Sequence, residues 1–186
     1  MWQKILLLLA DVFAIVCLTR CLLQWAQLNF THPLAEYSKQ TTDWLIKPLR
    51  KISPPIARWD TACVLATCVV YYLSYLITLF GSGASLSGSK ILLATTLFTL
   101  LSLSKALAYT LLIGMIARMI LSLRQTYSPL IPILNRIFQP LSQPFAKLKY
   151  RQYDFSGSVA ALLLWWWISI ILPYLNSSLN LWLLTA

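Results

Sequence analysis

Acidic residues are scarce in this chain, and the side-chain sets that usually carry catalysis are missing. Its 186 residues include five Asp and Glu against fifteen Lys and Arg, and a single histidine. Ser, His and Asp form no triad pattern, no glycine-rich loop is placed to hold phosphate, and no paired carboxylates indicate hydrolysis. We therefore expect no enzyme, no cofactor and no metal site.

The N-terminus lacks the cleavage pattern of a secretory signal. Residues 1–20, MWQKILLLLADVFAIVCLTR, carry Lys4 and an apolar run, but Asp11 interrupts the run and no A-x-A site follows. We predict a retained first span. The cysteines lie inside apolar segments, where they suit packing better than disulfides. They are Cys17, Cys21, Cys63 and Cys68.

Apolar residues are abundant: the hydrophobic content is 59% and the mean hydropathy is +0.70. This composition predicts an all-α integral membrane protein, since a membrane span needs about 20 mostly apolar residues. The apolar run 91–123 contains only Lys105 and Arg118 as charges, and no proline, so we expect one long helix there. Spans are predicted near residues 2–25, 61–80, 95–121 and 158–175, with Pro173 near the exit of the last.

The basic residues are concentrated in two connections. Six Lys or Arg lie within residues 20–60, six within 118–154, and three elsewhere. The positive-inside rule then places both connections in the cytoplasm and both termini outside. The expected location is a bacterial inner membrane. No basic soluble module indicates nucleic-acid binding.

Each connection contains a segment with apolar residues at spacings of three and four, near 33–47 and 129–139. This spacing predicts amphipathic helices, with Asp43 and Arg50 on the polar face of the first and Pro48, Pro140 and Pro144 breaking or kinking the helix ends. We expect the helices to lie in the headgroup region, with packing against the protein's own spans as the alternative. Their charges, with those of the flanking residues, form what we call the basic platform: Lys39, Lys47, Arg50, Lys51, Arg58, Arg124, Arg136, Lys147, Lys149 and Arg151.

The two halves align as a parallel internal repeat, because each contains two crossings. The proline spacing in the connection is 15 residues in both halves. We predict a first unit at 1–80, a Gly/Ser-rich loop at 81–90 and a second unit at 91–186. The repeat signature is Arg20, Pro33, Pro48 and Asp60 in the first unit, and Arg118, Pro129, Pro144 and Asp154 in the second.

The duplicated order of these motifs resembles the YggT family of small membrane proteins. The matching motifs are HPL, KPLRK and WDTA in the first unit, and SPL, QPFAK and YDFS in the second; Ala146 stands where the first unit has Arg50. The resemblance implies a bacterial inner-membrane protein with relatives linked to osmotic-stress tolerance, and plastid relatives linked to haem attachment and nucleoid organisation. It implies no established enzymatic activity.

Two sets of charged residues are candidates for buried pairs. Asp11 and Lys105 lie within predicted spans, where an unpaired charge is costly, so we expect them to pair. The signature residues Arg20, Asp60, Arg118 and Asp154 lie at span ends, and an Arg–Asp bond within or between units would fix how the units pack.

These observations favour a non-catalytic membrane scaffold, or an assembly or stress-tolerance factor. Its expected partners are anionic headgroups and either a membrane protein or a second copy of the chain. A small oligomeric channel or transporter is one alternative. The other is a haem or metal assembly factor using sulfur from a cluster of Cys17, Cys21, Met115 and Met119, with Cys63 and Cys68 also near the cytoplasmic edge.

Overall fold

In the computed structural model, the described residues are 2–26, 33–54, 60–81, 88–123, 130–143, 149–150, 153–154 and 156–185. Four helical stretches are long and apolar enough to cross a membrane: 2–25, 61–81, 89–121 and 157–182. The chain therefore has the expected fold, an all-α membrane protein with four spans. Between the second pair of spans, Lys149–Tyr150 (β1) and Tyr153–Asp154 (β2) form a short antiparallel ladder.

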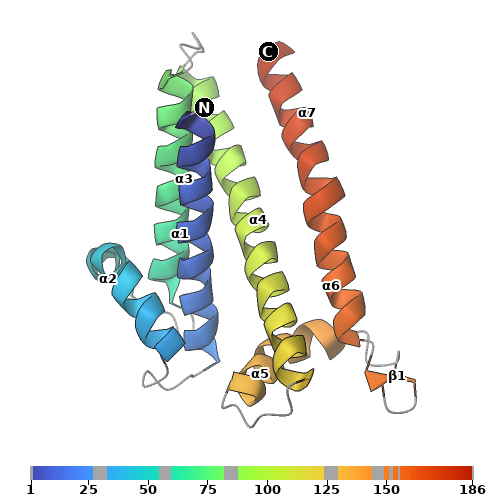
Figure 1. Ribbon diagram of the computed structural model, residues 1–186. Coiled ribbons are helices and arrows are strands. Elements are labelled where there is room, and N and C mark those ends of the chain that lie inside the picture. Colours follow the sequence, from blue (N-terminus) through green and yellow to red (C-terminus); the bar gives the residue numbers. More distant parts are fainter. Residues whose placement is uncertain are drawn as a thin grey trace.

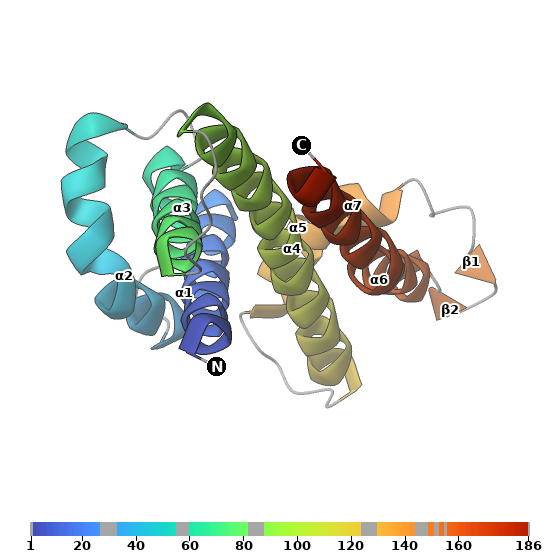
Figure 2. The same ribbon diagram turned by 90° about the horizontal axis from the view of Figure 1, so that it is seen from above.

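Three of the spans form a tight group. Helices α1 (Trp2–Trp25), α3 (Thr61–Gly81) and α4 (Gly88–Leu123) contact one another pairwise (Figures 1 and 2). Small residues such as Ala14, Ala66 and Ala106 are buried at their contacts. Small side chains let membrane helices approach closely, so packing can hold them together without a hydrophobic driving force.

The long apolar run 91–123 lies within one continuous helix, as expected. α4 has 36 residues, or roughly 54 Å at 1.5 Å per residue. That length exceeds a hydrocarbon core of about 30 Å. Figure 1 shows α4 inclined relative to α1, in keeping with a tilted span.

The fourth span is longer than predicted and does not end near Pro173. It consists of α6 (Ser156–Trp166), a π-helical segment (Trp167–Ile171) and α7 (Leu172–Thr185). A proline clashes with the carbonyl four residues earlier and lacks an N–H donor. The wider π turn accommodates this, with the Leu172 N–H donating to the Trp167 carbonyl five residues back. The helix therefore continues through Pro173.

Two shorter helices lie at the end of the bundle opposite both termini (Figure 1). α2 (Pro33–Ile52) contacts α1 and α3, and α5 (Leu130–Ser142) contacts α4 and α6. Both extend past their predicted ends, through Pro48 and Pro140 respectively. Figure 2 shows that α2 bends along its length, as a proline inside a helix requires.

The element order of span, short helix and span thus occurs twice along the chain. The duplication of sequence behind it stays a prediction. Several signature and platform positions lie outside the described residues: Pro129, Pro144, Arg58, Arg124, Lys147 and Arg151, together with the side chains of Pro33, Lys149 and Asp154.

Candidate functional site

The candidate site is α2 and the polar side chains that attach it to α1 and α3. One face of α2 is buried against the spans through Ala35, Ser38, Thr42 and Ile46, each at most 6% exposed. Three of these residues are small, so α2 can lie close to α1 and α3. Self-packing, the alternative to a purely headgroup location, is therefore part of the structure.

Arg20 of α1 reaches across to α2 and is almost fully buried, at 5% exposed. Its Nη1 donates to Thr42 Oγ1 at 2.7 Å, to Asp43 Oδ1 at 2.8 Å and to the Lys39 carbonyl at 3.4 Å. Asp43 also pairs with Lys47 one turn later, at 3.2 Å. Charge-assisted bonds of this kind are stronger than neutral ones, so the middle of α2 is firmly attached to α1.

A second ion pair attaches the C-terminal end of α2. Arg50 Nη2 bonds Asp60 Oδ2 at the start of α3, and the Asp60 side chain is 2% exposed. The Gln24 amide serves both groups when its nitrogen faces Asp60 Oδ2 at 2.7 Å and its oxygen faces Arg50 Nη2 at 3.0 Å. Ser53 and Thr61 are hydrogen-bonded at 2.9 Å beside this pair. We call Arg20–Asp43 and Arg50–Asp60 together the two clamps.

The clamps shift the proton equilibria of their members. Burial raises the pKa of the Asp43 carboxyl, but the hydrogen bonds from Arg20 and Lys47 outweigh burial and hold that pKa below its usual range. The hydrogen bond to Asp60 raises the pKa of Arg50 above its ordinary value. Asp43 and Arg50 are therefore charged at neutral pH.

The expected bond between Arg20 and Asp60 is wrong in the first unit. Arg20 pairs with Asp43, and Asp60 pairs with Arg50. The predicted apolar stripe of α2 ran through residues such as Tyr37, Thr41 and Trp44, and it therefore placed Asp43 and Arg50 on the polar face. The stripe of small residues at 35, 38 and 42 was the available signal. For Arg118 and Asp154 the expectation remains untested, since the Asp154 side chain is outside the described part.

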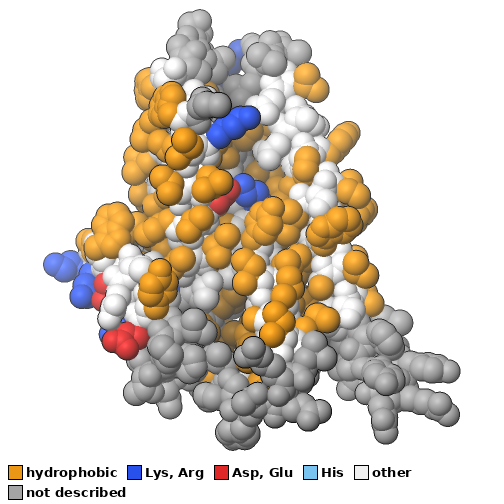
Figure 3. All heavy atoms as spheres, in the orientation of Figure 1, with side chains coloured by type: hydrophobic (Ala, Val, Ile, Leu, Met, Phe, Trp, Pro, Cys, Tyr) orange, Lys and Arg blue, Asp and Glu red, His pale blue; other side chains and the backbone are white. Residues whose placement is uncertain are grey.

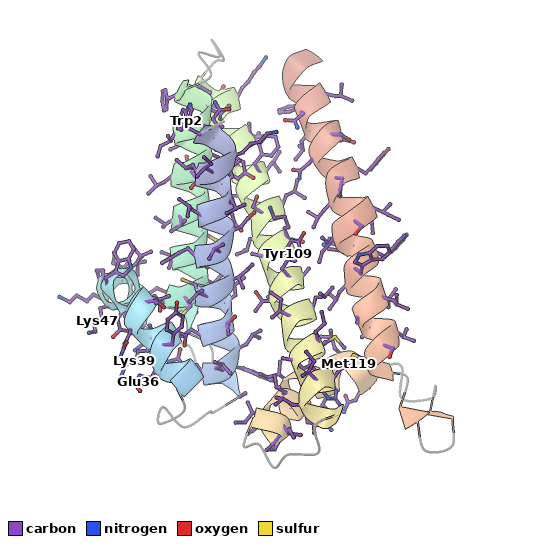
Figure 4. The ribbon with its side chains drawn as sticks, in the orientation of Figure 1. Trp2, Glu36, Lys39, Lys47, Tyr109 and Met119 are labelled. Atoms are coloured by element: carbon purple, nitrogen blue, oxygen red, sulfur yellow. The ribbon has the colours of Figure 1, made fainter. Side chains whose placement is uncertain are left out.

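The basic platform is smaller than predicted within the described residues. Lys39, Lys47 and Lys51 of α2 and Arg136 of α5 are exposed, whereas Arg50 belongs to a clamp. In Figure 4, Glu36, Lys39 and Lys47 point away from α1 and α3.

Beside those charges, α2 also exposes large apolar side chains. Tyr37 is 65% exposed, Trp44 68% and Ile52 78%. Trp44 additionally packs on Phe13 of α1, with ring centroids 6.0 Å apart. A helix with aromatic and basic side chains on its outer surface suits the headgroup region of a bilayer.

A second polar cluster lies within the spans themselves. Lys105 Nζ of α4 is 2.6 Å from Asp11 Oδ2 of α1, and the Tyr71 hydroxyl of α3 donates to Asp11 Oδ1 at 2.7 Å. The structure thus brings together the two charges that the sequence suggested as a pair. It also adds Tyr71, which the sequence did not suggest as a partner. Figure 3 shows how little charge the apolar face of the spans carries. Pairing removes the cost of an isolated charge within the spans. Through these two hydrogen bonds, Asp11 joins α1 to α3 and α4.

The sulfur side chains do not gather into one cluster. Cys17, Cys21 and Cys63 pack together in the core, but Met115 lies in a different core cluster and Met119 is 50% exposed. Among the described residues, no group of three or more His, Cys, Asp or Glu is arranged to hold a metal ion. The sulfur arrangement therefore adds nothing in favour of a haem or metal assembly role.

Comparisons with known proteins found similarity over the first unit and over much of the remaining chain. The model of the family described as CCB3/YggT matches residues 1–80. An uncharacterized protein in the proC 3' region of Vibrio alginolyticus is 32% identical, with 75% of each chain covered. The uncharacterized protein YggT of Escherichia coli K12 is 29% identical over 83% of this chain and 80% of its own length.

An uncharacterized protein of Haemophilus influenzae is 27% identical over 93% of this chain and 91% of its own. No solved structure matches the chain significantly. These relatives span both halves of the chain, so the likeness extends beyond the first unit.

Proposed function

The chain belongs to the CCB3/YggT family, and from that premise we propose that it is a non-catalytic scaffold of a bacterial inner membrane. In this proposal, the basic platform faces the cytoplasm and holds anionic headgroups or a partner membrane protein, while both termini are periplasmic. The chain would then act in the assembly or stress tolerance of the envelope.

One observation carries the proposal: two largely buried ion pairs attach the middle and the C-terminal end of α2, while its lysines stay outside. Fixing Arg20, Asp43, Arg50 and Asp60 immobilises the helix backbone, so the outer charges keep a constant spacing. A partner or lipid layer that meets a preordered surface pays less conformational entropy on binding. A fixed helix with exposed lysines suits binding better than catalysis, because catalysis would need a reactive group in a cleft.

The proposed orientation rests on charge. The connections that contain α2 and α5 hold twelve of the fifteen basic residues, and cytoplasmic connections are enriched in Lys and Arg. Anionic lipid on that face attracts basic segments by about 1 kcal/mol per residue. The bacterial origin of the relatives supports an inner membrane as the location.

Side chains within the spans favour a scaffold over a solute path. Hydroxyls of Thr67, Ser74, Thr99 and Thr110 donate to the backbone of their own helices at 2.7–2.9 Å. Asp11 and Lys105 neutralise each other. A channel needs polar groups directed into a shared pathway, and these groups are already used within the bundle.

Site-specific crosslinking tests the proposal. A photoreactive amino acid replacing Lys47, whose side chain is 75% exposed, is activated in native membranes, and the same reporter at exposed Asn180 near the opposite end serves as the matched control. We expect adducts to a defined protein or to anionic lipid from position 47 and not from 180. Equal adduct patterns at both positions contradict the proposal, as does solute flux that rises with protein dose in liposomes.

A further inference from the structure

An apolar cavity of about 290 Å³ lies between the two halves of the molecule. Its walls come from α1, α2, α4 and α5, and include Thr19, Leu22, Ser38, Thr110, Ala117 and Ile137. It is on the side of the bundle that carries the two short helices. Its volume corresponds to roughly ten water molecules, which is far too small for a helix about 10 Å in diameter. A single flexible chain can enter it.

The cavity wall is apolar even though four hydroxyl-bearing side chains line it. Thr19 donates to the Ile15 carbonyl at 2.7 Å, Ser38 to the Ala35 carbonyl at 2.9 Å and Thr110 to the Ala106 carbonyl at 2.7 Å. Each of these three hydroxyls is therefore bonded to its own helix, and the fourth belongs to Tyr37, whose side chain is 65% exposed. A cavity without directed polar groups is unfavourable for water and for polar solutes, and inside a bilayer the abundant apolar molecule is a lipid acyl chain.

Basic residues adjoin the cavity lining in the sequence of all four helices. Arg20 follows the lining residue Thr19 but is already paired with Asp43, and Lys39 follows Ser38 but points away from α1 (Figure 4). Arg118 follows Ala117 on α4, and Arg136 precedes Ile137 on α5. Glu36 is the one acidic neighbour, next to Tyr37. Arg118 and Arg136 are therefore the candidate partners of an anionic headgroup beside the apolar chain site.

We propose that this cavity holds one acyl chain of an anionic phospholipid, with the phosphate against Arg118 and Arg136. The acyl-chain site goes beyond the proposed scaffold role, while the choice of an anionic headgroup rests on it. The bound chain fills space between α1 and α2 of the first half and α4 and α5 of the second. It would therefore couple the halves through packing, since an unfilled cavity forfeits dispersion contacts along its lining.

Native mass spectrometry of the protein released from phosphatidylglycerol-containing nanodiscs tests the chain site. We expect one phospholipid per chain to survive mild delipidation of the unaltered protein. In Ala117→Phe the new ring occupies the cavity, and retained lipid should fall at least fivefold. Ile120→Phe, on an exposed face of the same helix (53% exposed), is the control and should retain lipid like the unaltered protein.

A second filling variant guards against a folding defect. Val16→Phe enters the same cavity from α1, and loss of lipid is read only from variants with unchanged helical content by circular dichroism. Equal retention in a folded filling variant and in Ile120→Phe overturns the chain site. So does an unaltered protein that holds no lipid after mild delipidation.

The headgroup is tested with lipids that have identical chains. Phosphatidylglycerol should be retained at least fivefold over phosphatidylcholine, and Arg136→Gln should reduce that preference while Lys51→Gln at the far end of α2 should not. Equal retention of the two lipids overturns the anionic headgroup. Crosslinking from position 47 in the Ala117→Phe variant separates the two proposals. If the adducts are unchanged while the lipid is lost, the adducts do not come from the cavity lipid, and the scaffold surface is independent of the cavity site.

Discussion

The two halves of the molecule attach their short helices to the spans by different chemistry. α2 is held by the two clamps, whereas α5 is held by apolar contacts, with Phe138 and Ile137 packed against Met115 and Ala160. Within the described residues, the acid in each ion pair belongs to the first half. A similar order of elements therefore does not imply a similar source of stability.

The sequence explains this difference once the halves are aligned on Pro48 and Pro144. Thr42 and Asp43 then correspond to Phe138 and Gln139, and Arg50 to Ala146. The second half has one acidic residue, Asp154, so it cannot repeat both clamps. The ring of Phe138 takes the place of the Thr42 hydroxyl, which accepts a hydrogen bond from Arg20 in the first half.

Breaking a clamp should produce the largest effect of any single change. Arg50→Met leaves the Asp60 carboxylate buried beside Gln24 without its cation, and removing one partner of a buried pair costs about 3–5 kcal/mol. Asp60→Asn should cost less, because Arg50 is 38% exposed and can turn to water. The measurement is reversible unfolding in mixed micelles. Equal costs for the two variants would contradict the burial asymmetry.

The intramembrane pair sharpens the comparison because it joins the halves. Asp11→Asn and Lys105→Met should each destabilise the protein, and the double variant should recover part of the loss, with a coupling of about 0.5–3 kcal/mol. Tyr71→Phe removes one hydrogen bond and should cost only about 0.5–1.5 kcal/mol. Strictly additive losses in the double-mutant cycle would mean that the two charges act independently.

The second half should be sensitive to shape where the first is sensitive to charge. A Cβ at Gly114 would lie 2.6 Å from Phe138 Cζ, so Gly114→Ala should cost about 1–3 kcal/mol through overpacking. Phe138→Leu should rescue it partly. Gly157→Ala is the matched control, since nothing lies within 4 Å of its Cβ and alanine favours the helix. A neutral Gly114→Ala would show that α5 is not tightly packed on α4.

Acid should release the first half before the second, with a small effect. The Asp43 pKa is lowered in the folded state, so its contribution is present above the unfolded value of about 3.9 and is lost as pH falls through the folded value. Fluorescence from a probe at Lys47 should therefore change below about pH 4. Asp43→Asn should lack that change, and an identical acid response in Asp43→Asn would exclude Asp43 as the titrating group.

Much of the fold was predictable because lipid imposes strong rules on sequence. The four spans and the single long α4 follow from the lengths of the apolar runs. The two charges within the spans predicted an ion pair. The partners of Arg20 and Asp60 were not predictable from the same patterns. Helical periodicity says which residues share a face, but not that small residues such as Ser38 and Thr42 turn that face inward. The π turn before Pro173 depends on local backbone hydrogen bonding, which cannot be predicted from composition.

Sidedness of α2 is the central claim, and cysteine labelling in intact cells tests it most directly. In a background without Cys17, Cys21, Cys63 and Cys68, single cysteines replace Lys47 on α2 and Ser85 between α3 and α4. An impermeant maleimide should label Ser85→Cys in intact cells and Lys47→Cys only after lysis, because the end of α3 and the start of α4 lie at the end of the bundle opposite α2. Labelling of both from outside, or of Lys47→Cys alone, would contradict a cytoplasmic platform.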